Sequence, residues 1–175
     1  MPQFQTSRRV AHSATDMFDL VADVERYPEF VPLCESLKLI GRTRDAAGHD
    51  VITARMTAAY KMLRESFTSR AVLDREAKVI RVAYLDGPFR RLENVWTFKP
   101  LGDESCDVGF SIAYEFRSMI LQTLMGAAFD KAFRKFAAAF EERADKVYGK
   151  KSSARTGVQP APDLPLKATP PAEAS

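Results

Sequence analysis

Apolar and polar residues alternate along much of the chain between residues 34 and 116, and this period of two predicts β-strands. The clearest run covers 105–116, where every second residue from Cys106 to Phe116 is apolar. Similar alternations cover 52–60, 63–73, 80–84 and 92–98. Breaks at 47–48, 74–78, 86–88 and 102–103 are spaced like hairpin turns. With the segment from residue 34 to the first break counted as one more strand, the pattern predicts six consecutive strands that pair antiparallel.

Two helices flank these strands. The segment from Ser13 to Asp16 has the form of a capping box and predicts the start of a short helix, which Pro28 and Pro32 end. After Arg117 the apolar period becomes 3.6, which predicts one long helix over 118–147, about 45 Å in length. Its apolar stripe consists of Leu121, Met125, Phe129, Phe133, Phe136 and Phe140.

The dimensions of these elements predict a curved sheet. Six strands make a sheet roughly 29 Å wide, whereas a helix is about 10–12 Å across. Because an exposed large apolar side chain costs about 1.5–3 kcal/mol, we expect an α+β fold in which the antiparallel sheet wraps around the C-terminal helix. Periodicity alone leaves open whether the interior is solid or hollow. Small residues that face inward would leave room for a ligand, and the candidates are Ala54, Ala58, Ala128 and Ala132.

Composition predicts one globular domain over 1–149 and a disordered Pro/Ala-rich tail over 150–175, which holds half of the ten prolines. The charges nearly cancel, with 26 basic and 23 acidic residues, which argues against a dedicated DNA-binding protein. We find neither a signal peptide nor a membrane-spanning run, so we expect a cytoplasmic protein. Cys34 and Cys106 lack the spacing of a metal site and are interpreted as small core residues.

Three segments resemble the coenzyme Q-binding START-like family: FDLVADVERYPEFVPLC at 18–34, DGPFRRLENVWTF at 86–98 and CDVGFSIAYEFRS at 106–118. This family shares its ancestry with RatA-type ribosome-association toxins, within the polyketide cyclase/dehydrase and lipid-transport superfamily. The resemblance implies a helix-grip fold whose hollow holds ubiquinone or a similar isoprenoid lipid. It also implies a role in supplying that quinone to the respiratory chain or to its biosynthesis. The alternative that it carries is a toxin that binds the large ribosomal subunit and blocks subunit association.

The family's aromatic-proline entrance segment and the apolar faces together predict the residues that contact the ligand. Leu33 stands where relatives often have tryptophan, so the resemblance does not extend to an aromatic ring stacked on the quinone at that position. The predicted contacts are Phe30, Val31, Pro32, Leu33, Met56, Tyr60, Phe67, Tyr84, Leu92, Trp96, Phe110, Tyr114, Met125, Phe129, Phe133 and Phe136. Ring carbonyls need one or two hydrogen-bond donors, for which the candidates are Tyr60, Tyr84, Tyr114, Trp96 and Asn94.

No catalytic or metal-binding constellation stands out, so we expect a protein that is not an enzyme and has no covalent cofactor. Glu65 shares a face with Leu63 and Phe67 and is the best candidate acid or base, which keeps a cyclase- or dehydrase-type enzyme as a third alternative. The candidate membrane or RNA surface consists of Lys61, Arg64, Arg90 and Arg91. Apolar residues at the start of the long helix, such as Met119, would help the protein to visit the inner face of the cytoplasmic membrane.

Overall fold

The computed structural model describes residues 3–150 of the chain. In chain order, the elements are β1 (Gln3–Val10), α1 (Ala14–Ala22), the short 3-10 helix η1 (Val24–Glu29), β2 (Cys34–Arg44), β3 (Asp50–Tyr60), β4 (Leu63–Asp74), β5 (Val79–Asp86), β6 (Phe89–Gly102), β7 (Ser105–Phe116) and α2 (Met119–Tyr148). The disordered tail predicted for 150–175 lies outside the described residues, except for residue 150.

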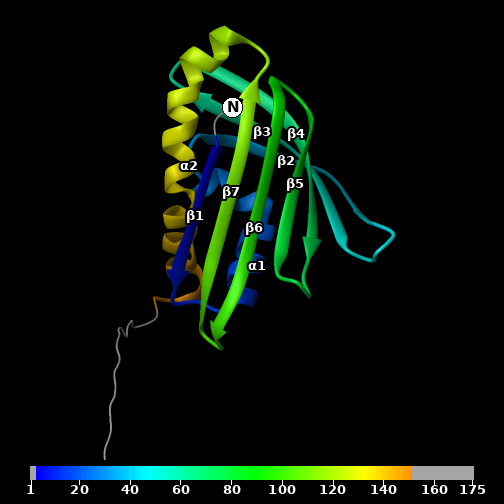
Figure 1. Ribbon diagram of the computed structural model, residues 1–175, viewed down its shortest axis with the longest axis vertical. Coiled ribbons are helices and arrows are strands. Elements are labelled where there is room, and N and C mark those ends of the chain that lie inside the picture. The colour runs from blue at the N-terminus through cyan, green and yellow to red at the C-terminus, as the bar shows by residue number, and fades with distance from the viewer. Residues whose placement is uncertain (1–2, 151–175) are drawn as a thin grey trace, which may run out of the picture.

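The strands form one antiparallel sheet in the order β1-β7-β6-β5-β4-β3-β2 (Figure 1). The five hairpins from β2 to β7 confirm the predicted pairing of consecutive strands. The predicted number of strands was wrong, because β1 adds a seventh strand at the edge beside β7. Its sequence, QFQTSRRV, buries only Val10, so it lacks the apolar alternation that marked the other strands.

Both predicted helices are present. The hydroxyl oxygen of Ser13 accepts a hydrogen bond from the Asp16 amide at 3.0 Å and caps α1. The chain then continues into η1, a 3-10 helix that contains Pro28, where the prolines predicted only a break in the helix. The hydroxyl oxygen of Ser118 caps α2 in the same way, and this 30-residue helix ends before Gly149. The long helix is therefore confirmed to within one residue at each end.

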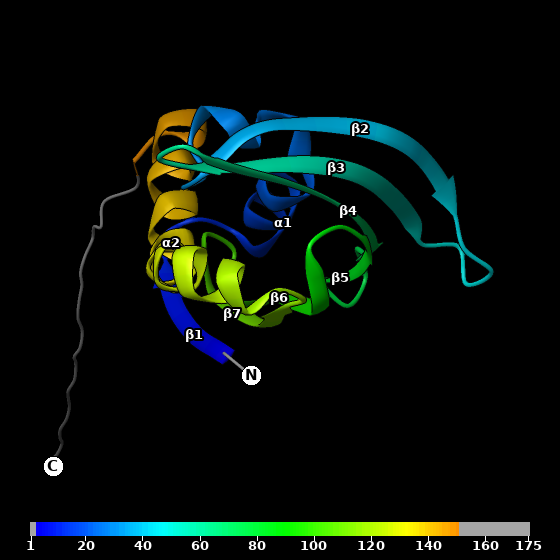
Figure 2. The same ribbon diagram turned by 90° about the horizontal axis from the view of Figure 1, so that it is seen from above.

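The sheet curves around the helices, as the comparison of widths predicted. Viewed from above, β2 and β3 arch over one side of α1 and α2, and β5, β6 and β7 cover the other side (Figure 2). Irregular pairing interrupts the β2–β3, β4–β5 and β6–β7 ladders, and such bulges let strands bend. The aromatic stripe of α2, including Phe129, Phe133 and Phe140, is buried against the concave face. This arrangement is the helix-grip fold.

Polar contacts fix the C-terminal half of α2. The buried side chain of His12 places Nε2 2.7 Å from Oδ1 of Asp145. Arg143 donates a hydrogen bond at 2.7 Å to Glu29 at the end of η1. Both contacts join residues more than 100 positions apart, so they tie α2 to the N-terminal elements beside the sheet. Cys34 and Cys106 are buried and unpaired, which confirms their interpretation as core residues.

Candidate functional site

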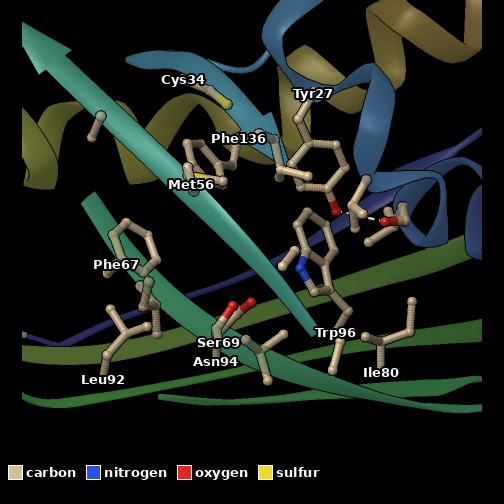
Figure 3. A pocket seen from close by; sticks show the side chains of 18 of the residues that line it. Tyr27, Cys34, Met56, Phe67, Ser69, Ile80, Leu92, Asn94, Trp96 and Phe136 are labelled. Atoms are coloured by element: carbon tan, nitrogen blue, oxygen red, sulfur yellow. Dashed lines mark hydrogen bonds between the residues drawn. The ribbon is translucent and has the colours of Figure 1, made fainter. Parts of the chain in front are cut away.

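A cavity lies between α2 and the concave face of the sheet (Figure 3). Its volume is about 120 Å³, counted as the space open to the centres of water molecules. Strands β2 to β7 supply one wall, α2 supplies the facing wall, and α1 and η1 close one end. Almost every lining side chain is aliphatic or aromatic, so the interior is apolar. The fold therefore has the hollow interior that the resemblance implied.

Small side chains create this space. Ala132 faces the cavity from α2, where the neighbouring lining residues Phe129, Phe133 and Phe136 are large rings. Ala54 and Ala58 leave further room on β3. Three of the four alanines expected to face inward thus line the cavity. The fourth, Ala128, is half-buried on α2 and is not a lining residue.

The end of the cavity beside η1 depends on an unusual backbone conformation. Leu33 has a φ of 67°, which is uncommon for a residue with a side chain, and its side chain lines the cavity. Its carbonyl accepts a hydrogen bond from the Ala59 amide at 2.9 Å, which ties this segment to β3. The Tyr27 hydroxyl donates a hydrogen bond to the Val21 carbonyl, so it is committed to the backbone of α1.

A glycine allows close packing where Phe67 and Phe89 line the cavity. Gly87 connects β5 to β6 with a φ of 143°, and a Cβ atom placed there would lie 2.6 Å from Cβ of Phe67. Only glycine fits at this approach, because the obstructing atoms include the Phe67 backbone. The Phe67 ring packs edge-on to the Phe89 ring at 5.3 Å, and both rings line the cavity.

The structure brings nine of the sixteen predicted ligand-contact residues together on the cavity wall. They are Pro32, Leu33, Met56, Phe67, Leu92, Trp96, Phe129, Phe133 and Phe136. They come from α2, from three strands and from the segment before β2, which only the three-dimensional fold makes neighbours. Ser69 is a lining residue that the prediction missed, although it shares its strand face with Phe67 and Ala71.

The other seven predicted contacts lie outside the lining: Phe30, Val31, Tyr60, Tyr84, Phe110, Tyr114 and Met125. Most of these side chains pack in the hydrophobic core around the cavity. The Phe30 ring lies 4.9 Å from the Phe140 ring, and the Phe110 ring lies 4.7 Å from Trp96. Phe30 and Phe110 thus pack against lining residues, and direct contact between these seven residues and a ligand stays a prediction.

Three of the five candidate hydrogen-bond donors, the tyrosines, do not line the cavity. The Tyr114 hydroxyl donates to the Gly126 carbonyl at 3.1 Å, and burial raises its pKa to about 12. The Tyr84 hydroxyl accepts a hydrogen bond from the Phe89 amide at 3.1 Å. The Tyr60 hydroxyl takes part in no hydrogen bond within residues 3–150. Trp96 and Asn94 do line the cavity, and Asn94 already donates from Nδ2 to the Ser111 carbonyl at 2.8 Å.

The lining contains no Asp, Glu, His, Lys or Arg side chain among residues 3–150. Burial raises the pKa of the Cys34 thiol to about 11, and it raises the pKa of the Tyr27 phenol as well. Glu65 lies opposite Ala58 in the β3–β4 ladder, but it is half-exposed and does not line the cavity. The described residues likewise contain no cluster of three side chains suited to a metal ion.

The four basic residues of the candidate membrane or RNA surface lie at one end of the sheet, near the β3–β4 and β5–β6 turns. Arg64 is ion-paired with Glu35 at 2.8 Å, and Arg91 with Glu93 at 2.8 Å. Arg90 lies 3.6 Å from Glu115. Lys61 has no carboxylate partner within the described part of the chain and lies over the Tyr60 ring. Three of the four charges are thus largely compensated.

The same end carries most of the exposed large apolar residues, and we call it the apolar tip. The β3–β4 turn, the β5–β6 turn and the β7–α2 connection all lie at that end, at the top of Figure 1. Met62 is 91% exposed in the first of these turns, and Met119 is 80% exposed at the start of α2. Ile120, Leu124 and Leu85 complete the tip. Between residues 3 and 150 no helix is long and apolar enough to cross a bilayer.

Comparisons with known proteins agree with this architecture. A family model described as polyketide cyclase / dehydrase and lipid transport matches residues 10–141. Ribosome association toxin RatA of Pseudomonas aeruginosa is 32% identical over 145 residues, which cover 83% of this chain and 96% of that protein.

Two further relatives extend the picture. Coenzyme Q-binding protein COQ10 homolog B, a mitochondrial protein of Xenopus laevis, is 28% identical over 152 residues, which cover 85% of this chain and 60% of that protein. The solution structure of the 18 kDa protein CC1736 from Caulobacter crescentus has a TM-score of 0.68 and 34% identity. The matched region covers 85% of this chain and 99% of CC1736. The relatives thus carry both a ribosome-association name and a coenzyme Q-binding name.

Proposed function

Because the chain belongs to the polyketide cyclase / dehydrase and lipid transport family, we propose that its cavity binds ubiquinone or a similar isoprenoid lipid with a ring-shaped headgroup. The observation that carries this proposal is an apolar cavity between α2 and the sheet. Ligand sites of this kind are concave and mostly apolar, with few polar groups. The coenzyme Q-binding name of the Xenopus laevis relative supports the same ligand class.

The size of the cavity limits how the ligand is held. An apolar cavity of roughly 150 Å³ accepts one benzene ring, so a cavity of about 120 Å³ accepts a group near the size of a single ring. A long isoprenoid tail does not fit in the same space. The headgroup therefore occupies the cavity, and most of the tail extends out of it toward a membrane or another apolar surface.

We further propose that the protein carries this lipid and does not transform it. Acid–base chemistry needs a group that titrates near neutral pH within reach of the ligand. The lining offers only Cys34 and Tyr27, and burial raises the pKa of both away from neutrality. Glu65 is not a lining residue. A carrier function for a quinone of the respiratory chain or of its biosynthesis needs none of these groups.

The apolar tip is the part of the surface that suits contact with the inner face of the cytoplasmic membrane. Transfer of one large apolar side chain out of water stabilises binding by about 1.5–3 kcal/mol when its burial is complete. Lys61 and Arg117 flank the tip without a carboxylate partner within residues 3–150 and would face lipid phosphates. Glu65 and Asp86 lie at the same end and keep it close to neutral. We expect membrane binding that depends mainly on the apolar residues and only weakly on salt.

A fluorescence titration tests lipid binding. Trp96 is the single tryptophan of the chain and lines the cavity, so its emission reports on the site. Purified, lipid-free protein is titrated with a short-tailed ubiquinone analogue, and saturable quenching is expected. The variant Ala144→Leu, which changes α2 away from the cavity lining, is the control for altered folding. If the emission of wild-type protein stays unchanged, the carrier proposal is wrong.

Vesicle flotation tests the membrane contact. Wild-type protein is expected to float with phosphatidylcholine vesicles that contain some anionic lipid, at both low and high salt. The double variant Met62→Ser/Ile120→Ser should lose flotation, because both side chains are exposed at the tip. The double variant Ile40→Ser/Leu101→Ser, which changes exposed apolar residues away from the tip, is the control. Equal flotation of both variants would contradict a role for the tip.

A second candidate function is binding to the large ribosomal subunit with a block of subunit association. The name of the Pseudomonas aeruginosa relative, which is 32% identical, favours it. The ion pairs of Arg64, Arg90 and Arg91 argue against that surface as the RNA contact, because their charges are already compensated. Cosedimentation with large subunits at low salt that is lost at high salt would support this candidate. Absence of cosedimentation at low salt would exclude it.

A further inference from the structure

Besides Tyr27 and Cys34, three lining side chains carry polar atoms: Ser69 on β4, and Asn94 and Trp96 on β6 (Figure 3). Asn94 and Trp96 are two residues apart on one strand, so both face the concave side. Ser69 lies two strands away, on the same face of the sheet. All three residues lie on the sheet wall of the cavity, which faces α2, and we call them the polar group.

The indole N–H of Trp96 is a donor without an acceptor. The side chain is 3% exposed, and it makes no hydrogen bond within the described part of the chain. Figure 3 shows its nitrogen turned toward the interior of the cavity. The nitrogen is not among the fully buried polar atoms that lack a partner, so it is open to the cavity, where a water molecule or a ligand oxygen can accept its hydrogen bond. A ligand oxygen in the cavity would meet this need.

Asn94 presents an acceptor. Its Nδ2 donates a hydrogen bond to the Ser111 carbonyl at 2.8 Å. A carbonyl oxygen cannot donate, so this contact fixes the orientation of the amide with the nitrogen toward β7. The amide oxygen of Asn94 is left without a protein donor among residues 3–150. Ser69 makes no hydrogen bond in the same range, and its hydroxyl can either donate or accept.

The polar group therefore needs two different hydrogen-bonding partners from the ligand. Trp96 needs an acceptor, whereas Asn94 needs a donor. A fully oxidised quinone offers only acceptors, so it satisfies Trp96 and leaves the Asn94 oxygen unpaired. A hydroquinone or a phenol offers both, because a ring hydroxyl donates and accepts.

We propose that the cavity selects lipids whose ring carries a hydroxyl donor, a hydroquinone or a phenol, over the fully oxidised quinone. This inference rests on the proposed function, since it specifies the ligand of the same cavity. Asn94 is the residue that makes the distinction, and Trp96 and Ser69 bind the ring oxygens without distinguishing the two forms. One neutral hydrogen bond changes affinity by about 2- to 12-fold, so we expect the reduced form to bind roughly fivefold more tightly.

The test compares decylubiquinol with decylubiquinone under anaerobic conditions, by calorimetry and by Trp96 fluorescence. Wild-type protein should bind the quinol about fivefold more tightly. Asn94→Leu should bring this ratio close to one. Ser69→Ala is the matched control on the same wall: it should weaken both ligands equally and leave the ratio unchanged.

Each outcome separates this inference from the proposed function. Equal affinities in wild-type protein, or tighter binding of the quinone, would overturn the selectivity and leave lipid binding intact. A ratio that persists in Asn94→Leu would overturn the role of Asn94. Failure of wild-type protein to bind either form would instead overturn the proposed function itself. The comparison in wild-type protein decides the matter even where a variant fails to fold.

Discussion

Filling the cavity from α2 should stabilise the protein, although the same change in a packed core would destabilise it. Ala132 is 6% exposed and lines the cavity, and Ala132→Leu adds three carbon atoms there. Each buried CH2 contributes about 0.8 kcal/mol, so the free energy of unfolding should rise by about 2 kcal/mol. Alanine and leucine differ little in helix propensity, so this term does not obscure the effect. The added atoms take the space of a ring, so quinone binding should be lost.

Urea unfolding followed by Trp96 fluorescence measures this change, with lipid-free protein throughout. Ala144 is fully buried on the same helix but does not line the cavity, so Ala144→Leu is the matched control. Overpacking at such a site costs about 1–3 kcal/mol. If both variants are destabilised to the same degree, the space around Ala132 is already filled, and the reasoning from a hollow interior is refuted.

Three further predictions concern the surroundings of the cavity. Asp145→Ala removes the partner of buried His12 and should lower the free energy of unfolding by about 1–3 kcal/mol in urea titrations; no change would show that this contact adds no stability. Burial raises the pKa of Cys34 to about 11, so iodoacetamide should react slowly at pH 8, faster toward pH 11, and more slowly when lipid is bound. Hydrogen bonds from Arg143 and Arg26 lower the pKa of Glu29 in the folded protein. These bonds therefore stabilise the folded state above the unfolded pKa of about 4.3, and the stabilisation is lost as the pH falls through the lower folded pKa. Glu29→Gln should therefore lose stability relative to wild type at neutral pH and differ little in strong acid; a pH-independent difference would contradict this.

The fold was largely predictable because its burial pattern is regular. In β7 every second residue from Cys106 to Phe116 is buried, which is the alternation seen in the sequence. The apolar stripe of α2 likewise repeats every three or four residues, because its burial pattern is regular. The apolar pattern did not predict strand β1, because an edge strand that buries one residue, Val10, needs few apolar positions. Its place in the sheet comes from hydrogen bonding to β7, which leaves no apolar pattern in the sequence.

The candidate site was predictable only in part. Periodicity identifies which residues face inward, and this placed Phe67, Trp96 and Phe133 correctly on the lining. It does not show which inward residues meet empty space and which meet another side chain. Phe110 faces inward but is covered by Trp96 and Phe136, so it supports the wall and does not line it. The hollow depends on how the curved sheet and α2 are spaced, a property of the whole fold.

The most direct test of a lipid-carrying cavity is a mass spectrum of the organic extract of the purified protein, with lipid counted per chain. Wild-type protein and the Ala144→Leu control should carry a prenylated ring lipid near one molecule per chain, and Ala132→Leu should carry almost none. An extract of wild-type protein without such a lipid, or the same amount from Ala132→Leu, would contradict the account.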